Sequence, residues 1–297
     1  MKSYPIFIVD VFAEEKYAGN QLAVVLDADT LSTAEMQRIA RETNFSETTF
    51  VTSAVERDGG YDVRIFTPNE ELPFAGHPTL GTAYVIRREI IRSACAGLAL
   101  NLKVGQIPVT FHSTDDGEEV LWMRQQPPTF GAQGIAPESI APVLGIEVGE
   151  IDVRFPIEEV STGVPFIIVP LKSLATMKRI RVNRDRYFKL IDATVAKSVF
   201  VFCPETYHPD NQLNARMFGD YYGVSEDPAT GSANGCLAGY LVQHRYFSTD
   251  EIEVRVEQGY EIKRPSLLRL RAARLDAQRI EVEVGGKVYL SVEGRLV

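Results

Sequence analysis

Three ionisable side chains stand where they could move a proton: Glu47, His77 and Asp227. Glu47 lies at the entrance of an apolar run, and His77 and Asp227 flank two turns of similar sequence. A carboxylate made more basic by partial burial can take a carbon-bound proton, and an imidazole near its ordinary pKa can donate or accept one. The three residues therefore indicate general acid/base catalysis.

The two turns are Pro73-Phe74-Ala75-Gly76-His77 and Pro228-Ala229-Thr230-Gly231-Ser232. A helix that opens at Gly76 or Gly231 presents unpaired backbone N–H groups and the positive end of its dipole. Such a helix end suits a carboxylate or a developing oxyanion. We therefore expect the turns to bind a small acidic ligand, in a cleft between two lobes.

The segments after these turns, residues 79–86 and 233–242, have almost no polar face, which predicts helices that are buried on nearly all sides. A different helix is predicted from Ser32 to about Thr43, where Ser32 and Glu35 form a capping box. Asp115-Asp116-Gly117 and Gly285-Gly286 separate apolar runs and predict tight hairpin turns. Short alternating apolar runs predict strands at residues 6–12, 22–26, 48–51, 61–66, 109–112 and 120–123.

The chain is long for one hydrophobic core, and its two halves resemble each other at an offset of 155 residues from Pro73 and Gly76 to Pro228 and Gly231. A proline-containing stretch from Gln125 looks like a linker. We therefore predict an N-terminal lobe at residues 1–125 and a similar C-terminal lobe at residues 126–297, whose last strands can pack back on the first lobe.

The two halves differ at the positions of the three ionisable residues. The second half has Ser198 near the position of Glu47 and Ser232 in place of His77. The first half has Leu72 in place of Asp227. This asymmetry favours a one-base proton shift over a symmetric two-base racemisation.

Several classes of function lack support. A net charge of −9 without a basic run disfavours nucleic acid. No zinc-ligand, P-loop, dinucleotide or serine-hydrolase motif is present, so we expect neither metal nor cofactor. Three widely spaced cysteines fit a reducing cytoplasm, and no apolar run is long enough for a signal peptide or a membrane span, so we expect a cytoplasmic protein.

Four ordered motifs resemble the phenazine biosynthesis PhzF-like family over nearly the whole chain: residues 19–24, 44–48, 74–79 and 226–235. The resemblance implies an α+β, diaminopimelate epimerase-like fold, with two pseudo-symmetric lobes of mixed, mostly antiparallel strands curled round a central buried helix. It implies a cofactor-independent isomerase, with dihydro-hydroxyanthranilate isomerisation as the characterised reaction, and a homodimer. It matches Glu47 to the family's catalytic glutamate, and His77, Asp227, Gly76, Gly231 and Ser232 to residues around the substrate. We therefore expect catalytic roles for Glu47, His77 and Asp227, and substrate binding by Asn20, Gly76, Gly231 and Ser232.

Related cysteine-type epimerases carry a cysteine on each side, whereas Ala75 and Thr230 precede the two glycines here, so Cys236 is interpreted as helix core. Phe218-Gly219-Asp220 departs from the family pattern, in which a proline follows the phenylalanine, and this leaves the substrate open. The alternative function is a non-catalytic ligand-binding or interaction protein that retains the isomerase fold.

Overall fold

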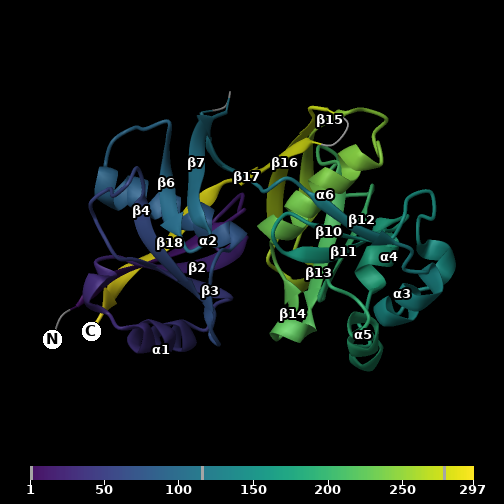
Figure 1. Ribbon diagram of the computed structural model, residues 1–297, viewed down its shortest axis with the longest axis horizontal. Helices are drawn as coiled ribbons and strands as arrows, with labels where there is room; N and C mark the ends of the chain where they lie inside the picture. Colours follow the sequence, from purple (N-terminus) through teal and green to yellow (C-terminus); the bar gives the residue numbers. More distant parts are fainter. Residues whose placement is uncertain (1–2, 115–116, 277–278) are drawn as a thin grey trace. The chain divides into compact units, whose positions relative to one another are not determined.

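The computed structural model describes residues 3–114, 117–276 and 279–297 and divides into two compact units (Figure 1). One unit consists of Met1–Arg124 and Gly285–Val297, and the other of Gln125–Val284. The sequence interpretation assigned residues 126–297 to one lobe, apart from last strands that could pack back. The final strand, β18, belongs to the first unit because it pairs antiparallel with β1 along that strand's whole length.

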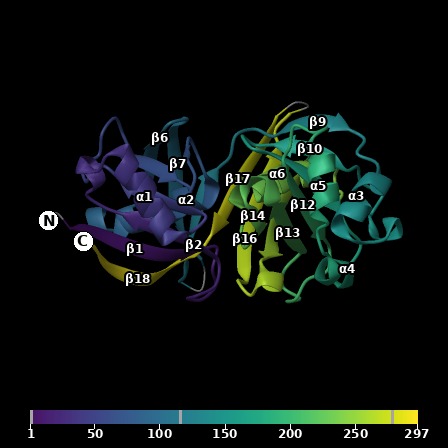
Figure 2. The same ribbon diagram turned by 90° about the horizontal axis from the view of Figure 1, so that it is seen from below.

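The first unit is a curved sheet around one helix (Figures 1 and 2). Its strands pair in the order β18, β1, β2, β3, β4, β6, β7, β8, and all pairs are antiparallel except β2–β3 and β4–β6. Its elements are β1 (Tyr4–Val11), β2 (Asn20–Val25), η1 (Ala28–Thr30), α1 (Thr33–Thr43), β3 (Glu47–Val51), β4 (Tyr61–Phe66), β5 (Glu71–Leu72), α2 (Gly76–Ile86), the π-helical η2 (Arg87–Ile91), β6 (Gly97–Leu102), β7 (Gly105–Ser113), β8 (Glu119–Arg124) and β18 (Val288–Leu296).

Helix α2 is buried on nearly all sides, as its apolar sequence predicts. Only Tyr84 of its eleven residues is not buried, and the helix contacts β1, β2, β3, β6, β7 and β8. Gly81 permits this close packing, because a Cβ atom there would lie 2.7 Å from Leu22 and 2.8 Å from Val11. The strands therefore wrap the helix whose first turn carries His77.

Helix α1 begins after Ser32 with the predicted capping box, in which Ser32 and Glu35 bond to each other's backbone N–H groups. It buries Met36 and Ala40 against Phe50 and Phe66. The predicted boundaries are confirmed at both ends.

The second unit repeats this plan. Its strands pair in the order β9, β10, β11, β12, β13, β15, β16, with β11–β12 and β13–β15 parallel, and its central helix α6 contacts β10, β11, β15 and β16. Its elements are β9 (Thr129–Gln133), α3 (Pro137–Leu144), η3 (Val148–Glu150), β10 (Glu158–Ser161), β11 (Pro165–Pro170), α4 (Leu174–Arg179), α5 (Arg184–Ile191), β12 (Ser198–Cys203), β13 (Leu213–Gly219), η4 (Asp220–Tyr222), β14 (Val224–Asp227), α6 (Gly231–Gln243), β15 (Glu251–Gln258), η5 (Tyr260–Ile262), β16 (Ser266–Arg274) and β17 (Ile280–Gly286). The last two residues of β17, Gly285 and Gly286, belong to the first unit.

One ion pair recurs in both units and supports the repeat. Arg64 on β4 binds Glu71 on β5 through two guanidinium nitrogens, at 2.8 Å each. Arg216 on β13 binds Glu226 on β14 in the same way, at 2.8 and 2.6 Å. In each unit the glutamate stands just before the turn that opens the central helix.

Gly285 and Gly286 do not form the predicted hairpin turn. They are the last residues of β17, neither has a positive φ, and β18 begins at Val288. A Cβ atom would lie 2.5 Å from the Trp122 ring at Gly285 and 2.4 Å from the Phe12 ring at Gly286. These glycines serve close packing against aromatic rings, which their sequence position alone does not distinguish from a turn.

Antiparallel pairing of β7 with β8 agrees with the other predicted hairpin, although Asp115 and Asp116 lie outside the described residues. Strand β9 lies in the stretch predicted as a linker, and the prediction misses it because Pro127 and Pro128 precede the strand and Gly131 interrupts it. No helix in the described ranges is long and apolar enough to cross a membrane.

Gly285→Ala is expected to lower the free energy of unfolding by about 1–3 kcal/mol, because the new methyl group overpacks the Trp122 ring. Denaturant unfolding measures this change. Gly149→Ala is the control, since a Cβ atom at Gly149 meets nothing within 4 Å. Equal losses in both variants would contradict the packing role of Gly285.

Candidate active site

The first unit brings three of the predicted site residues into one cluster. Asn20 is the first residue of β2, Glu47 is the first residue of β3, and His77 is the second residue of α2. The His77 Nε2 atom lies 3.3 Å from a Glu47 carboxylate oxygen. The His77 Nδ1 atom lies 3.4 Å from the Asn20 amide nitrogen. The imidazole therefore stands between an amide and a carboxylate.

The two members of the closest contact are both shielded from water. The side chain of His77 is 7% exposed and that of Glu47 is 15% exposed. Burial lowers the pKa of His77 from 6.5 to about 3, while a hydrogen bond with the Gln21 backbone acts in the opposite direction. The expectation of a histidine near its ordinary pKa is therefore wrong, because the first turn of α2 is enclosed by strands and does not face solvent. His77 is neutral at physiological pH.

This lowered pKa has a consequence for stability. Between pH 6.5 and about 3 the unfolded state binds a proton at His77 that the folded state does not, so stability falls as the pH falls through this window. In His77→Gln the dependence of unfolding free energy on pH is expected to be weaker here, by up to about 1.4 kcal/mol per pH unit.

Denaturant titrations from pH 7 to pH 4 measure this difference. His112→Gln is the control because His112 is exposed on β7. If the unfolding free energies of wild type and His77→Gln changed with pH in the same way, His77 would bind its proton equally in the folded and unfolded states. That outcome would contradict the prediction.

The second unit places Asp227, Gly231 and Ser232 at the start of α6. Asp227 ends β14 and is 7% exposed, and its carboxylate accepts a hydrogen bond from the Thr230 hydroxyl. Gly231 and Ser232 are the first two residues of α6. The helix therefore presents its unpaired first-turn N–H groups at the end of the strand that carries Asp227.

Both turns are held to their helices in the same way. In the first unit the Thr79 hydroxyl donates to the Ala75 carbonyl at 2.8 Å. In the second unit the Asn234 amide donates to the Thr230 carbonyl at 3.0 Å. The turn is thus a repeated support, on which the two units carry different reactive groups.

The strand pairings confirm that Ser198 stands in the second unit at the position of Glu47. Glu47 lies opposite Leu22 in the β2–β3 pair, and Ser198 lies opposite Phe166 at the same point of the β11–β12 pair. Cys236 is fully buried within α6, and burial raises its pKa to about 12. Its interpretation as helix core is confirmed, and it is no base for a cysteine mechanism.

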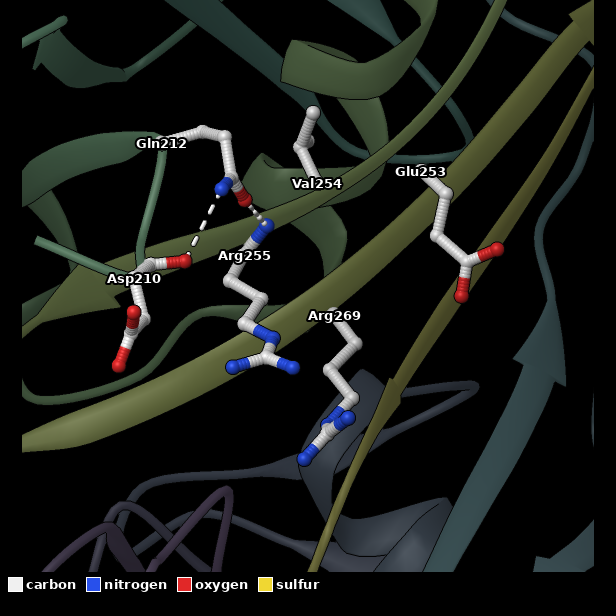
Figure 3. Close-up of a pocket in the computed structure, with 6 residues that line it drawn as sticks. All are labelled: Asp210, Gln212, Glu253, Val254, Arg255 and Arg269. Atoms are coloured by element: carbon white, nitrogen blue, oxygen red, sulfur yellow. Dashed lines mark hydrogen bonds between the residues drawn. The ribbon is translucent and has the colours of Figure 1, made fainter. Parts of the chain in front are cut away.

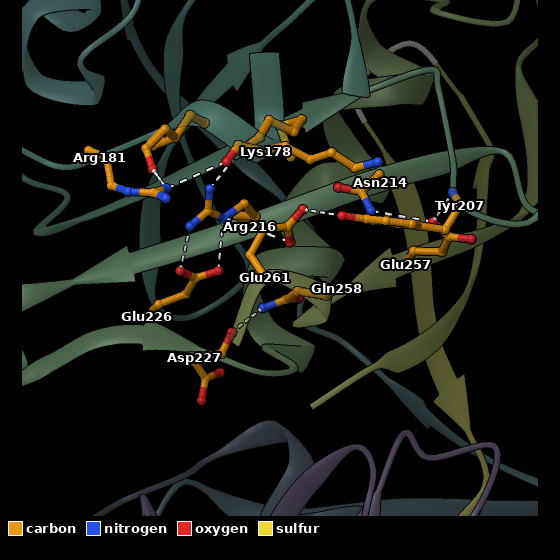
Figure 4. A network of polar contacts seen from close by, with 12 residues as sticks. Lys178, Arg181, Tyr207, Asn214, Arg216, Glu226, Asp227, Glu257, Gln258 and Glu261 are labelled. Atoms are coloured by element: carbon orange, nitrogen blue, oxygen red, sulfur yellow. Dashed lines mark hydrogen bonds and ion pairs between the residues drawn. The ribbon is translucent and has the colours of Figure 1, made fainter. Parts of the chain in front are cut away.

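The sequence interpretation missed Gln258, a fully buried residue at the end of β15. Its side chain makes hydrogen bonds to Asp227, Thr230 and Asn234. The one local signal is Gly259, which follows β15 with a φ of +80° and where a Cβ atom would lie 2.6 Å from the Pro228 carbonyl oxygen. Figure 4 shows the Gln258 amide reaching the Asp227 backbone beside the Arg216 ion pairs.

The second unit has a pocket of about 640 Å³ (Figure 3). None of the predicted site residues lines it, and we assign it no part in the reaction. In the part of the chain that the structure describes, no three His, Cys, Asp or Glu side chains are arranged to hold a metal ion. The pocket is lined by Asp210, Gln212, Glu253, Val254, Arg255 and Arg269.

Comparison with known proteins confirms the predicted resemblance and fold. The family model described as "Phenazine biosynthesis-like protein" matches residues 9–294. The trans-2,3-dihydro-3-hydroxyanthranilate isomerase of Pseudomonas aeruginosa is 36% identical over 288 residues, which cover 97% of each chain.

Solved structures agree. The phenazine biosynthesis protein of the PhzF family from Bacillus anthracis superposes with a TM-score of 0.91 at 32% identity, covering all of both chains. A hydroxyproline epimerase from Agrobacterium vitis, at 11% identity, shares the fold with a TM-score of 0.64, covering 100% of this chain and 91% of its own.

Proposed function

Because the chain belongs to the phenazine biosynthesis-like family and is an isomerase, we propose that it moves a proton between two carbon atoms of a small carboxylate-bearing substrate without a cofactor. The observation that carries the proposal is the contact of Glu47 with His77 at the buried start of α2. The relative's name describes catalysis, which favours an enzyme over the alternative of a non-catalytic binding protein.

Glu47 is the proposed base. Its carboxylate takes the proton of a substrate C–H bond, and the electron pair of that bond passes into the conjugated substrate as an enolate-like charge. Glu47 then returns the proton to another carbon atom, so that substrate and product have the same composition. A carboxylate that is only 15% exposed loses little of its reactivity to solvation by water.

His77 is proposed to position and assist Glu47. An imidazolium beside the carboxylate would weaken Glu47 as a base, because a positive charge favours the deprotonated carboxylate. The neutral His77 imidazole does not have this effect. Asn20 faces the other ring nitrogen and limits rotation of the ring. We assign Asn20 to substrate binding as well, since it begins β2 at the same end of the sheet as Glu47.

The turn residues are proposed to bind the acidic part of the substrate. Gly76 opens α2, and Gly231 and Ser232 open α6. Backbone N–H groups at a helix start stabilise a carboxylate or an enolate-like oxygen, and they do so without a positively charged side chain. Asp227 supplies a hydrogen-bond acceptor beside the second of these helix starts.

trans-2,3-Dihydro-3-hydroxyanthranilate is the first substrate to test, because it is named in a relative that is 36% identical and it carries a carboxylate. We expect ¹H NMR in deuterated water to show its isomerisation by the purified protein, with deuterium entering the carbon that receives the proton. A protein that converts neither this compound nor other small cyclic acids, while still binding them, would contradict the proposal.

A further inference from the structure

We propose that Gln258, acting through Thr230, is a positioning residue that holds the Asp227 carboxylate in one orientation. This inference rests on the proposed role of Asp227 in the reaction. Gln258 lies on β15, whereas Asp227 and Thr230 flank the turn between β14 and α6. The residue thus reaches the reactive turn from a separate strand.

The backbone determines which way the Gln258 amide points. The Thr230 N–H group can only donate, so the atom 3.2 Å from it must be the amide oxygen of Gln258. The Asp227 carbonyl can only accept, so the atom 2.9 Å from it must be the amide nitrogen. The Asn234 amide nitrogen donates to the same Gln258 oxygen at 2.9 Å. Both ends of the amide are therefore assigned by their partners.

This orientation sets the direction of the next hydrogen bond. The Gln258 nitrogen lies 3.1 Å from the Thr230 hydroxyl oxygen and must donate to it. The Thr230 hydroxyl is then free to direct its own hydrogen to the Asp227 Oδ2 atom, which it contacts. The chain runs in one direction from amide to hydroxyl to carboxylate, and it anchors one carboxylate oxygen.

The first unit lacks every polar member of this chain. Its turn has Leu72 and Ala75 where the second has Asp227 and Thr230. Leu102 of β6 occupies the position in the first unit that is equivalent to Gln258 of β15. This follows when the parallel β4–β6 pair of the first unit is aligned with the parallel β13–β15 pair of the second.

A hydrogen bond confirms this alignment of the two units. Asn101 bonds to Asp62 in the first unit, and Asn214 bonds to Glu257 at the corresponding pair of positions in the second. Since the first turn opens its helix without polar residues at these positions, the Gln258 chain is not needed to form such a turn. Its specific effect is to orient Asp227.

The test compares Thr230→Val and Gln258→Met with Thr230→Ser, which keeps the hydroxyl. With trans-2,3-dihydro-3-hydroxyanthranilate, Thr230→Val and Gln258→Met are each expected to lower kcat by about tenfold or more, because an unheld carboxylate samples unproductive orientations. Thr230→Ser should stay within about threefold of wild type. Crystal structures of Thr230→Val and Gln258→Met should show the Asp227 carboxylate rotated or in two conformers.

Two controls separate positioning from stability. Thr176→Val removes a buried hydroxyl that donates to the Glu150 carboxylate at 3.0 Å in the same unit. Glu257→Gln changes the residue next to Gln258. The Glu257 carboxylate accepts hydrogen bonds from the Tyr207 and His208 N–H groups and not from the turn. Both controls can lower Tm, but neither should change kcat by more than about threefold or turn Asp227.

Wild-type kcat in Thr230→Val, or an unmoved Asp227 in its crystal structure, would overturn the proposal. If the wild-type protein does not convert the test compound, the substrate assignment fails. The orientation of Asp227 in the Thr230→Val and Gln258→Met crystals then decides the positioning role by itself.

Discussion

Glu47→Gln is expected to lower kcat for isomerisation by about 10²–10⁴-fold, the usual contribution of a general acid/base group. The amide keeps the shape of the side chain and can still contact His77, but it cannot take a carbon-bound proton. KM should change much less than kcat, because the substitution removes an interaction of the transition state. Initial rates with trans-2,3-dihydro-3-hydroxyanthranilate measure both constants, and NMR in deuterated water measures the exchange step.

Glu71→Gln is the matched control for this prediction. Its side chain is 13% exposed, close to the 15% of Glu47, and it lies in the same unit. Because Glu71 pairs with Arg64 and Lys103, its replacement should lower stability and leave kcat near that of wild type. Deuterium exchange at an undiminished rate in Glu47→Gln would reject Glu47 as the base.

Asp227→Asn is expected to lower kcat/KM by about 100-fold or more, since it replaces a buried carboxylate in a site where solvent does not screen the change. The amide has the same shape and can still accept from the Thr230 hydroxyl, so the fold of the turn should remain.

Asp152→Asn controls for the loss of a buried aspartate in the second unit. Asp152 is 2% exposed and binds Arg154 at 2.8 Å, away from the start of α6. Its replacement should affect unfolding more than turnover. Equal kinetic losses in the two variants would mean that Asp227 acts through stability, and the proposed role would then be wrong.

Local pattern was sufficient for the elements that support the site. The Ser32 and Glu35 capping box predicted the start of α1, and the absence of a polar face predicted that α2 and α6 are buried. These features depend on residues within one or two turns of each other, so the sequence contains all the information they need. The glycines of β17 show the limit, because their function depends on distant aromatic rings.

Within the site, the sequence by itself determined which residue types stand at the two turns and that only one half carries Glu47 and His77. Tertiary structure decided the rest. It placed the His77 ring 3.3 Å from Glu47 and lowered its pKa by burial, and it brought Gln258 from β15 to the turn that carries Asp227. Desolvation and long-range hydrogen bonds arise only when separate strands close around a helix, and for that reason no local pattern could reveal them.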